Sequence, residues 1–164
     1  GYEATTAAQS MMDKMVENGV ADAHQFSLML TLCKSSDEIR EVIDVAMPEA
    51  GVKPDVVTYK TLIGMLRVEG DDEAAKKVVE EMKKAKVQPD EKTKEILNSP
   101  ARGKILSRMR MNKLSWLLRQ GGDEATAAAR SMMDKMVENG VAHGEVTYNI
   151  MIDMLRIEGY DETA

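Results

Sequence analysis

Carboxylate pairs that could serve as a general acid and a general base occur at Glu80-Glu81 and at Asp71-Asp72-Glu73. Such pairs work in catalysis only where burial and mutual repulsion separate their pKa values. Both clusters fall where a helix cap or a solvated helix face is expected, and the sequence holds no glycine-rich phosphate loop. The sequence therefore predicts a protein that is not an enzyme, and it indicates no small-molecule substrate.

Side chains that could ligate a metal are few and far apart. His24 and His143 are the two histidines and Cys33 is the single cysteine, so no Cys or His partners stand at the spacing of a zinc site. We therefore expect no metal and no other cofactor. A lone cysteine also excludes an internal disulfide, and we expect Cys33 to be a small buried apolar residue.

The clearest charge signal is a basic stretch in a chain whose net charge is −6. Residues 96–122 contain no acidic side chain and six basic ones, Arg102, Lys104, Arg108, Arg110, Lys113 and Arg119. This stretch is either a surface for an anionic partner such as RNA or a helix that docks onto the chain's own acidic surfaces. Trp116 within it either packs in a core or repeat interface, or offers its ring for stacking to a partner.

The elements that must position these residues are internally repeated. Residues 1–21 and 122–142 are identical at all but three positions, and residues 57–75 closely match residues 146–164. Self-similarity of this extent is the signature of an architecture built from copies of one supersecondary unit.

The repeat period corresponds to one helical hairpin. Residues 47–55 recur 35 positions later as residues 82–90, with Met, Val, Pro and Asp at the same places. Residues 57–67 and 71–85 each carry apolar side chains at three- and four-residue steps, which is typical of amphipathic helices. Gly70 and the aspartates that follow it supply the caps between the two helices.

Each hairpin leaves an apolar face that its neighbour must cover, so we expect an all-α fold, a short α-solenoid of stacked helix-turn-helix units. One array would fill residues 1–164, with units at about 1–22, 23–55, 56–90, 91–144 and 145–164, the last of them truncated. Met82 and its counterpart Met136 lie 54 residues apart instead of 35, so the fourth unit contains an irregular insertion at about 98–120. This insertion is predicted to include a helix near Lys104–Gln120.

From Val52 to Asp90 the sequence VKPDVVTYKTLIGMLRVEGDDEAAKKVVEEMKKAKVQPD resembles a nearly complete pentatricopeptide repeat. The Val-Thr-Tyr opening and the Lys/Gln-Pro-Asp ending carry the resemblance, while the Trp-Leu-Gly-Tyr pattern of tetratricopeptide repeats is missing. The resemblance extends over most of the chain. It is weaker in residues 23–55, where His-Gln-Phe replaces Val-Thr-Tyr.

The resemblance implies binding of single-stranded RNA, with one base read per repeat by a few side chains. Carried over by position, the base-reading candidates are Ser27 with Asp55, Lys60 with Asp90, and Asn149 with a partner beyond the chain end. A hydroxyl paired with Asp resembles the guanine-preferring combination of the family. Lys60 and Asp90 are not a standard pair and offer an ion pair to each other instead.

Three further positions, His24, Val57 and Val146, fall where the family sandwiches each base, although first-turn packing accounts for them equally well. The acidic net charge counts against strong RNA binding, because phosphate neutralisation supplies most nonspecific affinity. The alternative function is a non-catalytic helical adaptor or structural subunit that binds protein partners in a large organellar assembly, such as a ribosome or a photosynthetic or respiratory complex.

Localisation to a mitochondrion or chloroplast is implied by the family alone. The chain begins at Gly1 without Met, lacks a targeting peptide and stops inside a unit, so we expect a fragment or a processed product. No run approaches the ~20 apolar residues that cross a bilayer, and we expect no membrane span.

Overall fold

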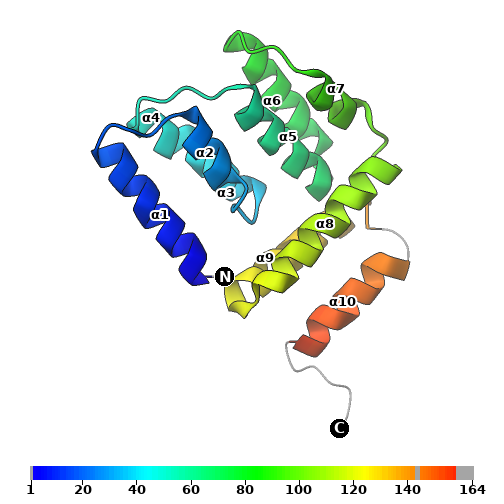
Figure 1. The fold of residues 1–164 in the computed structure, drawn as a ribbon. Helices are drawn as coiled ribbons and strands as arrows, with labels where there is room; N and C mark the ends of the chain where they lie inside the picture. Colours follow the sequence, from blue (N-terminus) through cyan, green and yellow to red (C-terminus); the bar gives the residue numbers. More distant parts are fainter. Residues whose placement is uncertain (1, 143–144, 158–164) are drawn as a thin grey trace.

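The computed structural model describes residues 2–142 and 145–157, and every regular element in these ranges is a helix (Figure 1). The prediction of an all-α fold built from helical hairpins is confirmed. No helix within these ranges is long and apolar enough to cross a membrane.

The first part of the chain forms α1 (Tyr2–Glu17), α2 (Ala23–Leu30) and a long helix of three segments. These segments are α3 (Ser36–Glu41), the π-helical turn η1 (Val42–Ala46) and α4 (Met47–Glu49). The π-turn widens the helix locally, and the sequence pattern did not predict it. The long helix returns antiparallel to α2 and completes a hairpin with it (Figure 1).

The second hairpin consists of α5 (Val56–Glu69) and α6 (Asp72–Lys84). Asp55 caps α5 by accepting a hydrogen bond from a backbone N–H of its first turn. Gly70 ends α5 in the left-handed conformation, with φ of 88°, and Asp71 caps α6 in the same manner as Asp55 caps α5. The Gly-Asp device between the two helices is therefore present as predicted.

A third hairpin follows the short helix α7 (Glu91–Asn98). It consists of α8 (Lys104–Gln120) and α9 (Gly122–Glu138), and α10 (Glu145–Ile157) packs against both of its helices. The chain turns between α8 and α9 at Gly121, whose φ is 68°. The helix predicted inside the irregular insertion is thus present as α8, with the predicted limits.

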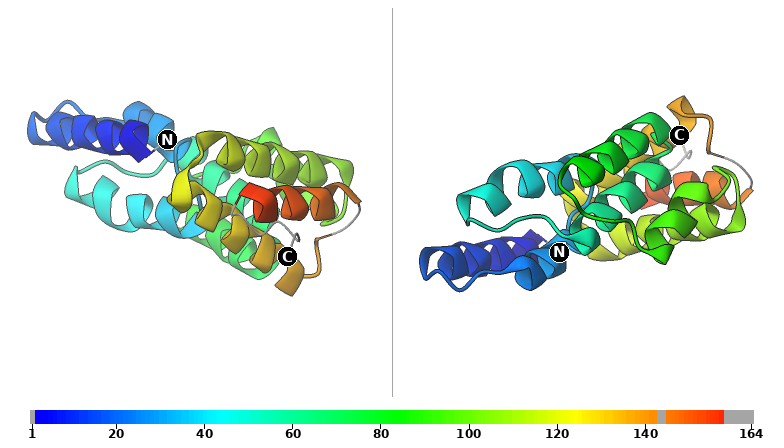
Figure 2. Two further views of the ribbon diagram at one scale, coloured as in Figure 1. Left: turned by 90° about the horizontal axis from the view of Figure 1, so that it is seen from below. Right: turned by 90° about the horizontal axis from the view of Figure 1, so that it is seen from above.

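The helices form two layers around α5. Figure 2 shows α2 and α8 in one layer and α3–α4 and α9 in the other. α5 contacts α2, α3, α6, α7, α8 and α9, and every residue from Leu62 to Glu69 is buried. The third hairpin does not continue the stack alongside α5 but crosses its C-terminal end (Figure 1).

Methionines fill much of the core, as the low aromatic content requires. Met47, Met82 and Met133 are almost completely buried and belong to one continuous apolar cluster with Phe26, Leu62 and other aliphatic side chains. The long, unbranched and flexible Met side chain fills irregular gaps between the helices. The core therefore continues from the first two hairpins into the third.

Hydrogen bonds at the C-terminal end of α5 explain why the third hairpin crosses there. The last carbonyls of a helix have no partner within the helix and need donors from elsewhere. Arg110 of α8 donates from Nε to the Val68 carbonyl (2.8 Å) and from a terminal nitrogen to the Arg67 carbonyl (3.1 Å). Asn139, just after α9, donates to the Glu69 carbonyl (3.1 Å). Donors from the third hairpin thus satisfy three consecutive carbonyls of α5.

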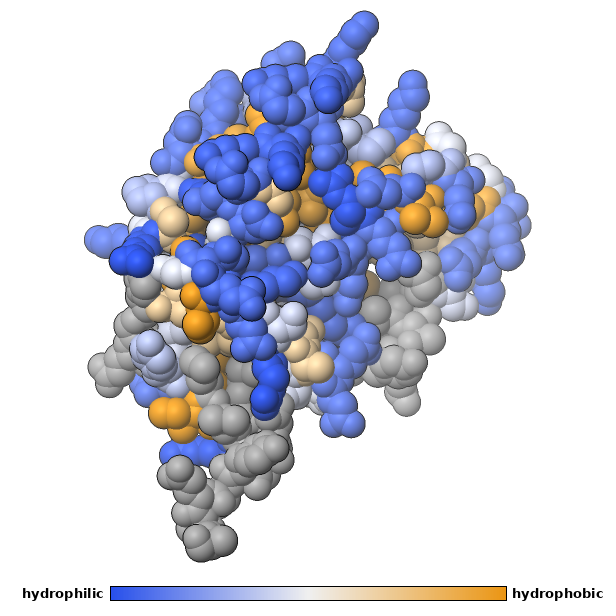
Figure 3. Space-filling view, turned by 180° about the vertical axis from the view of Figure 1, so that it is seen from behind, coloured by the Kyte–Doolittle hydropathy of each residue, from blue (hydrophilic) through white to orange (hydrophobic). Residues whose placement is uncertain are grey.

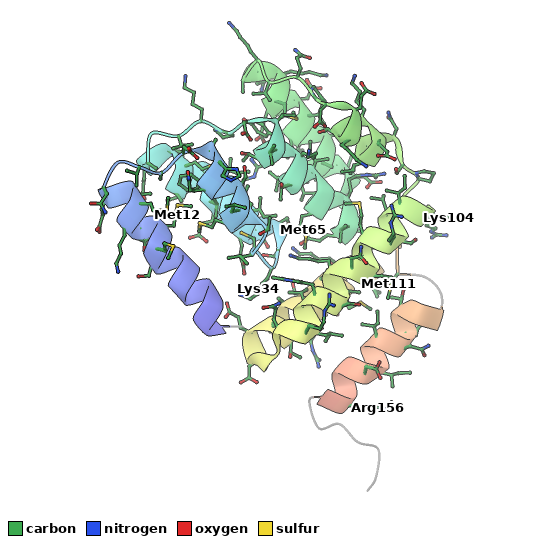
Figure 4. The ribbon with its side chains drawn as sticks, in the orientation of Figure 1. Met12, Lys34, Met65, Lys104, Met111 and Arg156 are labelled. Carbon is green, nitrogen blue, oxygen red and sulfur yellow. The ribbon has the colours of Figure 1, made fainter. Side chains whose placement is uncertain are left out.

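The Glu69 side chain joins the same end of α5 to the first hairpin. Its carboxylate is 2% exposed and accepts hydrogen bonds from the Ser36 amide (3.1 Å) and hydroxyl (2.5 Å) and from Lys135 Nζ (3.4 Å). Nearby, the buried Lys34 forms an ion pair with Glu124 at 3.3 Å (Figure 4). The start of α3, the end of α5 and both helices of the third hairpin are therefore held at one junction.

We predict that Gly70→Ala destabilises the protein more than Gly140→Ala. Both glycines have positive φ, of 88° and 65°, so alanine costs about 1–2 kcal/mol at either position. Only at Gly70 would the new Cβ clash, lying 2.7 Å from Val141 and 2.8 Å from Asn139, whereas nothing lies within 4 Å at Gly140. We expect an additional loss of about 2 kcal/mol for Gly70→Ala in urea denaturation. Equal losses would show that the third hairpin does not pack on this turn.

Candidate nucleic-acid interface

A cavity of about 600 Å³ opens on the side of α5 that faces α7 and α8, and we name it the α5–α8 cavity. Its floor is apolar and includes Leu30, Met65 and Met109. Its polar wall consists of Thr31, Lys60, Thr61, Lys92, Asn112, Lys113 and Trp116. None of the described residues that line the cavity is acidic, although the chain as a whole is. A volume of this size is typical of a ligand site, and its charge favours an anion.

The basic residues of the 96–122 stretch divide between two environments. Lys104, Arg108 and Arg119 are exposed and follow one side of α8 at helical spacing; Figure 4 shows Lys104 pointing away from the molecule. Arg102 is also exposed and donates to the Gly140 carbonyl at 2.9 Å. We name Lys104, Arg108 and Arg119 the basic stripe of α8.

Arg110 does not belong to a partner-facing surface, and this corrects the predicted basic patch. Its side chain is 3% exposed, and besides the two carbonyls of α5 it donates to the Ala101 carbonyl at 2.6 Å. A buried guanidinium needs hydrogen-bond partners, and here each of its three nitrogen atoms donates to a backbone carbonyl. Burial also lowers its pKa below the ordinary value for arginine.

Lys113 lies in the wall of the α5–α8 cavity in an unusual environment for a lysine. Its Nζ donates to the Cys33 carbonyl at 2.5 Å and lies 4.1 Å from the centroid of the Trp116 ring. Burial lowers the pKa of its ammonium group below the ordinary value. Within the described part of the chain no carboxylate lies at ion-pair distance, whereas Lys60 pairs with Asp90 and Lys92 with Glu95.

Cys33 is buried, as predicted, and lacks a disulfide partner. Burial, reinforced by the negative charge of Glu38, raises the pKa of its thiol to about 12. The thiolate form that reacts or binds metals is therefore suppressed at neutral pH. Its backbone carbonyl accepts the hydrogen bond from Lys113, which lines the cavity.

Residues 42–93, which run from η1 through both helices of the second hairpin into α7, match the family described as pentatricopeptide repeat domain. This segment of the chain is therefore similar to a pentatricopeptide repeat. Proteins with this repeat generally bind RNA and are generally non-catalytic binding modules. No curated protein matches the sequence.

Within the matched repeat, the candidate base-reading residues Lys60 and Asp90 lie together. Lys60 Nζ is 3.3 Å from Asp90 Oδ2, so the ion pair expected between them is present. Lys60 lines the α5–α8 cavity, and Asp90 caps α7 by accepting hydrogen bonds from the Thr93 amide and hydroxyl. The candidate reading residue Lys60 therefore lies in the wall of the cavity.

The other candidate reading pair, Ser27 with Asp55, is not linked by a hydrogen bond between its two side chains. Ser27 Oγ donates to the Ala23 carbonyl at 2.8 Å, and Asp55 accepts from the Thr58 amide and hydroxyl. Each side chain is thus engaged within its own helix instead of with the other. Asn149 is exposed on α10, and its partner was expected beyond the chain end.

Two of the three base-sandwiching candidates present accessible surface. Val57 is 39% exposed and lies one turn before Lys60 on α5, and His24 is exposed at the same position of α2. The side chain of Val146 lies outside the described residues. Lys92 of α7 also lines the cavity, and sequence reasoning did not single it out.

We predict that the low pKa of Asp90 depends more on Thr93 than on Lys60. Hydrogen bonds from the Thr93 hydroxyl and amide, followed by the Lys60 ammonium, lower the pKa of Asp90 from 3.8 to about 2. Because the folded pKa is lowered, ionised Asp90 stabilises the protein above pH 3.8, and this contribution disappears as the pH falls through about 2. In ¹³C NMR titrations of the carboxyl group, Thr93→Val should raise the pKa more than Lys60→Met. The reverse order would contradict this assignment.

Proposed function

We propose that this chain binds single-stranded RNA on the face formed by α2, α5, α7 and α8. The observation that carries the proposal is the α5–α8 cavity, in which the reading position of the matched repeat lies among lysines without a lining carboxylate. The layer of α2 and α8 presents this face, whereas the opposite side of the molecule is hydrophilic with scattered apolar residues (Figures 2 and 3). Nucleic-acid binding requires such a local concentration of positive charge.

Positive charge is concentrated on this face, so the acidic net charge of the whole chain does not prevent RNA binding there. Phosphates respond to the potential near the site, and charges beyond about 10 Å are largely screened at physiological salt. The basic stripe of α8 lies beside the cavity on the same helix as Lys113 and Trp116. In this proposal the bases face the cavity and the stripe contacts the phosphates.

We also propose that the chain is an array of repeat units at about 1–22, 23–55, 56–90, 91–144 and 145–164. In this proposal the protein acts in a mitochondrion or chloroplast. The hairpins α5–α6 and α8–α9 support this division into units, because α9 repeats the sequence of α1 almost without change. The process in which the RNA takes part would be processing, stabilisation or translation in that organelle.

A second candidate function, a protein-binding adaptor in an organellar assembly, is favoured by one observation. Met11 of α1 is 66% exposed, whereas Met132, its counterpart in α9, is 2% exposed. Tyr148 and Ile152 of α10 are exposed one turn apart. Apolar surface of this kind marks protein interfaces, and in this proposal it serves a role separate from the RNA face.

We predict that replacing the basic stripe by Lys104→Gln, Arg108→Gln and Arg119→Gln weakens RNA binding. Fluorescence anisotropy with a short single-stranded RNA should show affinity falling as salt rises from about 50 to 200 mM. The triple variant should bind on the order of tenfold more weakly at low salt, and the slope of log K against log salt should fall by about 2 if three phosphate contacts are lost.

The matched control is Lys77→Gln, Lys84→Gln and Lys86→Gln, which removes the same charge from α6 and the loop after it, away from the α5–α8 cavity. This control should keep most of the affinity. Equal weakening in both triple variants would mean that only net charge matters. Absence of binding by the unmodified protein at low salt would reject the RNA proposal and favour the adaptor.

A further inference from the structure

We propose that Trp116 is a stacking site for a nucleobase, separate from the positions by which the repeats read bases. This proposal rests on the proposed RNA binding and adds a specific contact to it. Trp116 lies on α8, outside the matched residues 42–93, and it is none of the candidate base-reading or base-sandwiching residues. The residue is also the only tryptophan in the sequence.

The position of Trp116 on α8 separates it from the core-facing residues. Leu106, Arg110, Leu114 and Leu117 form the buried side of the helix at three- and four-residue spacing. Trp116 is half-buried and lies with Met109 and Lys113 on the side that lines the α5–α8 cavity. Trp116 packs against the edge of the core from this side, and its remaining surface lines the cavity.

The ring is fixed in place before any ligand binds. Lys113 Nζ lies 4.1 Å from its centroid and is itself held by the Cys33 carbonyl. A cation against an aromatic face is attractive, and more so where the ammonium is partly desolvated, as burial makes it here. A preorganised ring loses little conformational entropy on stacking, which is why rigid aromatic residues serve as stacking platforms.

The indole N–H of Trp116 is available as well. No hydrogen bond of the described residues uses Nε1, and no buried side-chain nitrogen or oxygen in this part of the chain lacks a partner, so Nε1 reaches solvent. Together with Asn112 in the same wall it can donate to the edge of a base.

Charge identifies the occupant as a nucleotide instead of an uncharged aromatic group. Of the three lysines in the cavity wall, Lys113 is the one without a carboxylate at ion-pair distance among the described residues. A nucleotide brings an aromatic ring for Trp116 and a phosphate for Lys113 or the neighbouring basic stripe. An apolar peptide would leave the ammonium of Lys113 without an anionic partner in a partly desolvated site.

The test uses the fluorescence of the single tryptophan. A short single-stranded RNA should quench the emission of Trp116 saturably, with the same apparent Kd that anisotropy of labelled RNA gives. An abasic oligomer of the same length, which offers phosphates but no rings, should leave the emission unchanged. Trp116→Leu should weaken RNA binding about tenfold, and Trp116→Phe should lose less because it keeps a ring.

The outcomes separate this proposal from the broader one. If anisotropy shows RNA binding while the emission of Trp116 does not change, the stacking site is rejected and RNA binding stands. Trp116→Leu with unchanged affinity leads to the same rejection. If the protein binds no RNA at low salt, both proposals fail. Circular dichroism of the variants verifies their fold, and the quenching arm uses the unmodified protein, so it does not depend on them.

Discussion

The carbonyl groups of Val68 and Glu69 end α5 without partners in their own helix, while that of Arg67 accepts from the Gly70 N–H at 3.2 Å, and the donors that reach this end hold the third hairpin against it. Arg110 binds the carbonyls of Arg67 and Val68, and Asn139 binds that of Glu69. Each such group left buried without a partner would cost about 1–3 kcal/mol. A positive charge at a helix C-terminus also interacts favourably with the helix dipole. In a regular stack of hairpins, solvent would satisfy these carbonyls.

This arrangement has a direct consequence for the surface that α8 presents. Once Arg110 and the leucines of its face are held against the end of α5, the adjacent face of α8 must lie beside α5 and α7. That adjacent face carries Met109, Lys113 and Trp116 and closes the α5–α8 cavity. α8, which lies outside the matched repeat, therefore forms one wall of the candidate RNA site.

Much of the second hairpin could be predicted from sequence because its signals are local. Gly70 and the aspartates after it fix the turn between α5 and α6, and the repeat period fixes the limits of both helices. The limits of α8 were equally clear, since turn-forming residues precede it and glycines follow it. The Lys60–Asp90 ion pair could be anticipated because both residues occupy known positions of one unit.

Other features depend on contacts between distant segments and could not be read in this way. Met11 and Met132 lie in nearly identical sequences, yet one is exposed and the other buried, because only α9 has α5 and α8 beside it. Arg110 was assigned to a basic patch from its charge, although its spacing from Leu106 and Leu114 already placed it on the apolar face. Its carbonyl partners on α5 lie more than 40 residues away.

The most direct test of this account compares Arg110→Met with Arg108→Met, two changes of equal charge and size on α8. Urea denaturation should show a loss of about 2–5 kcal/mol for Arg110→Met, because carbonyls of α5 lose their buried donors, and less than about 0.5 kcal/mol for the exposed Arg108→Met. The emission of Trp116 should shift only in Arg110→Met as the cavity wall loosens. If both variants were equally stable with unchanged emission, the end of α5 would not be what holds the third hairpin in place.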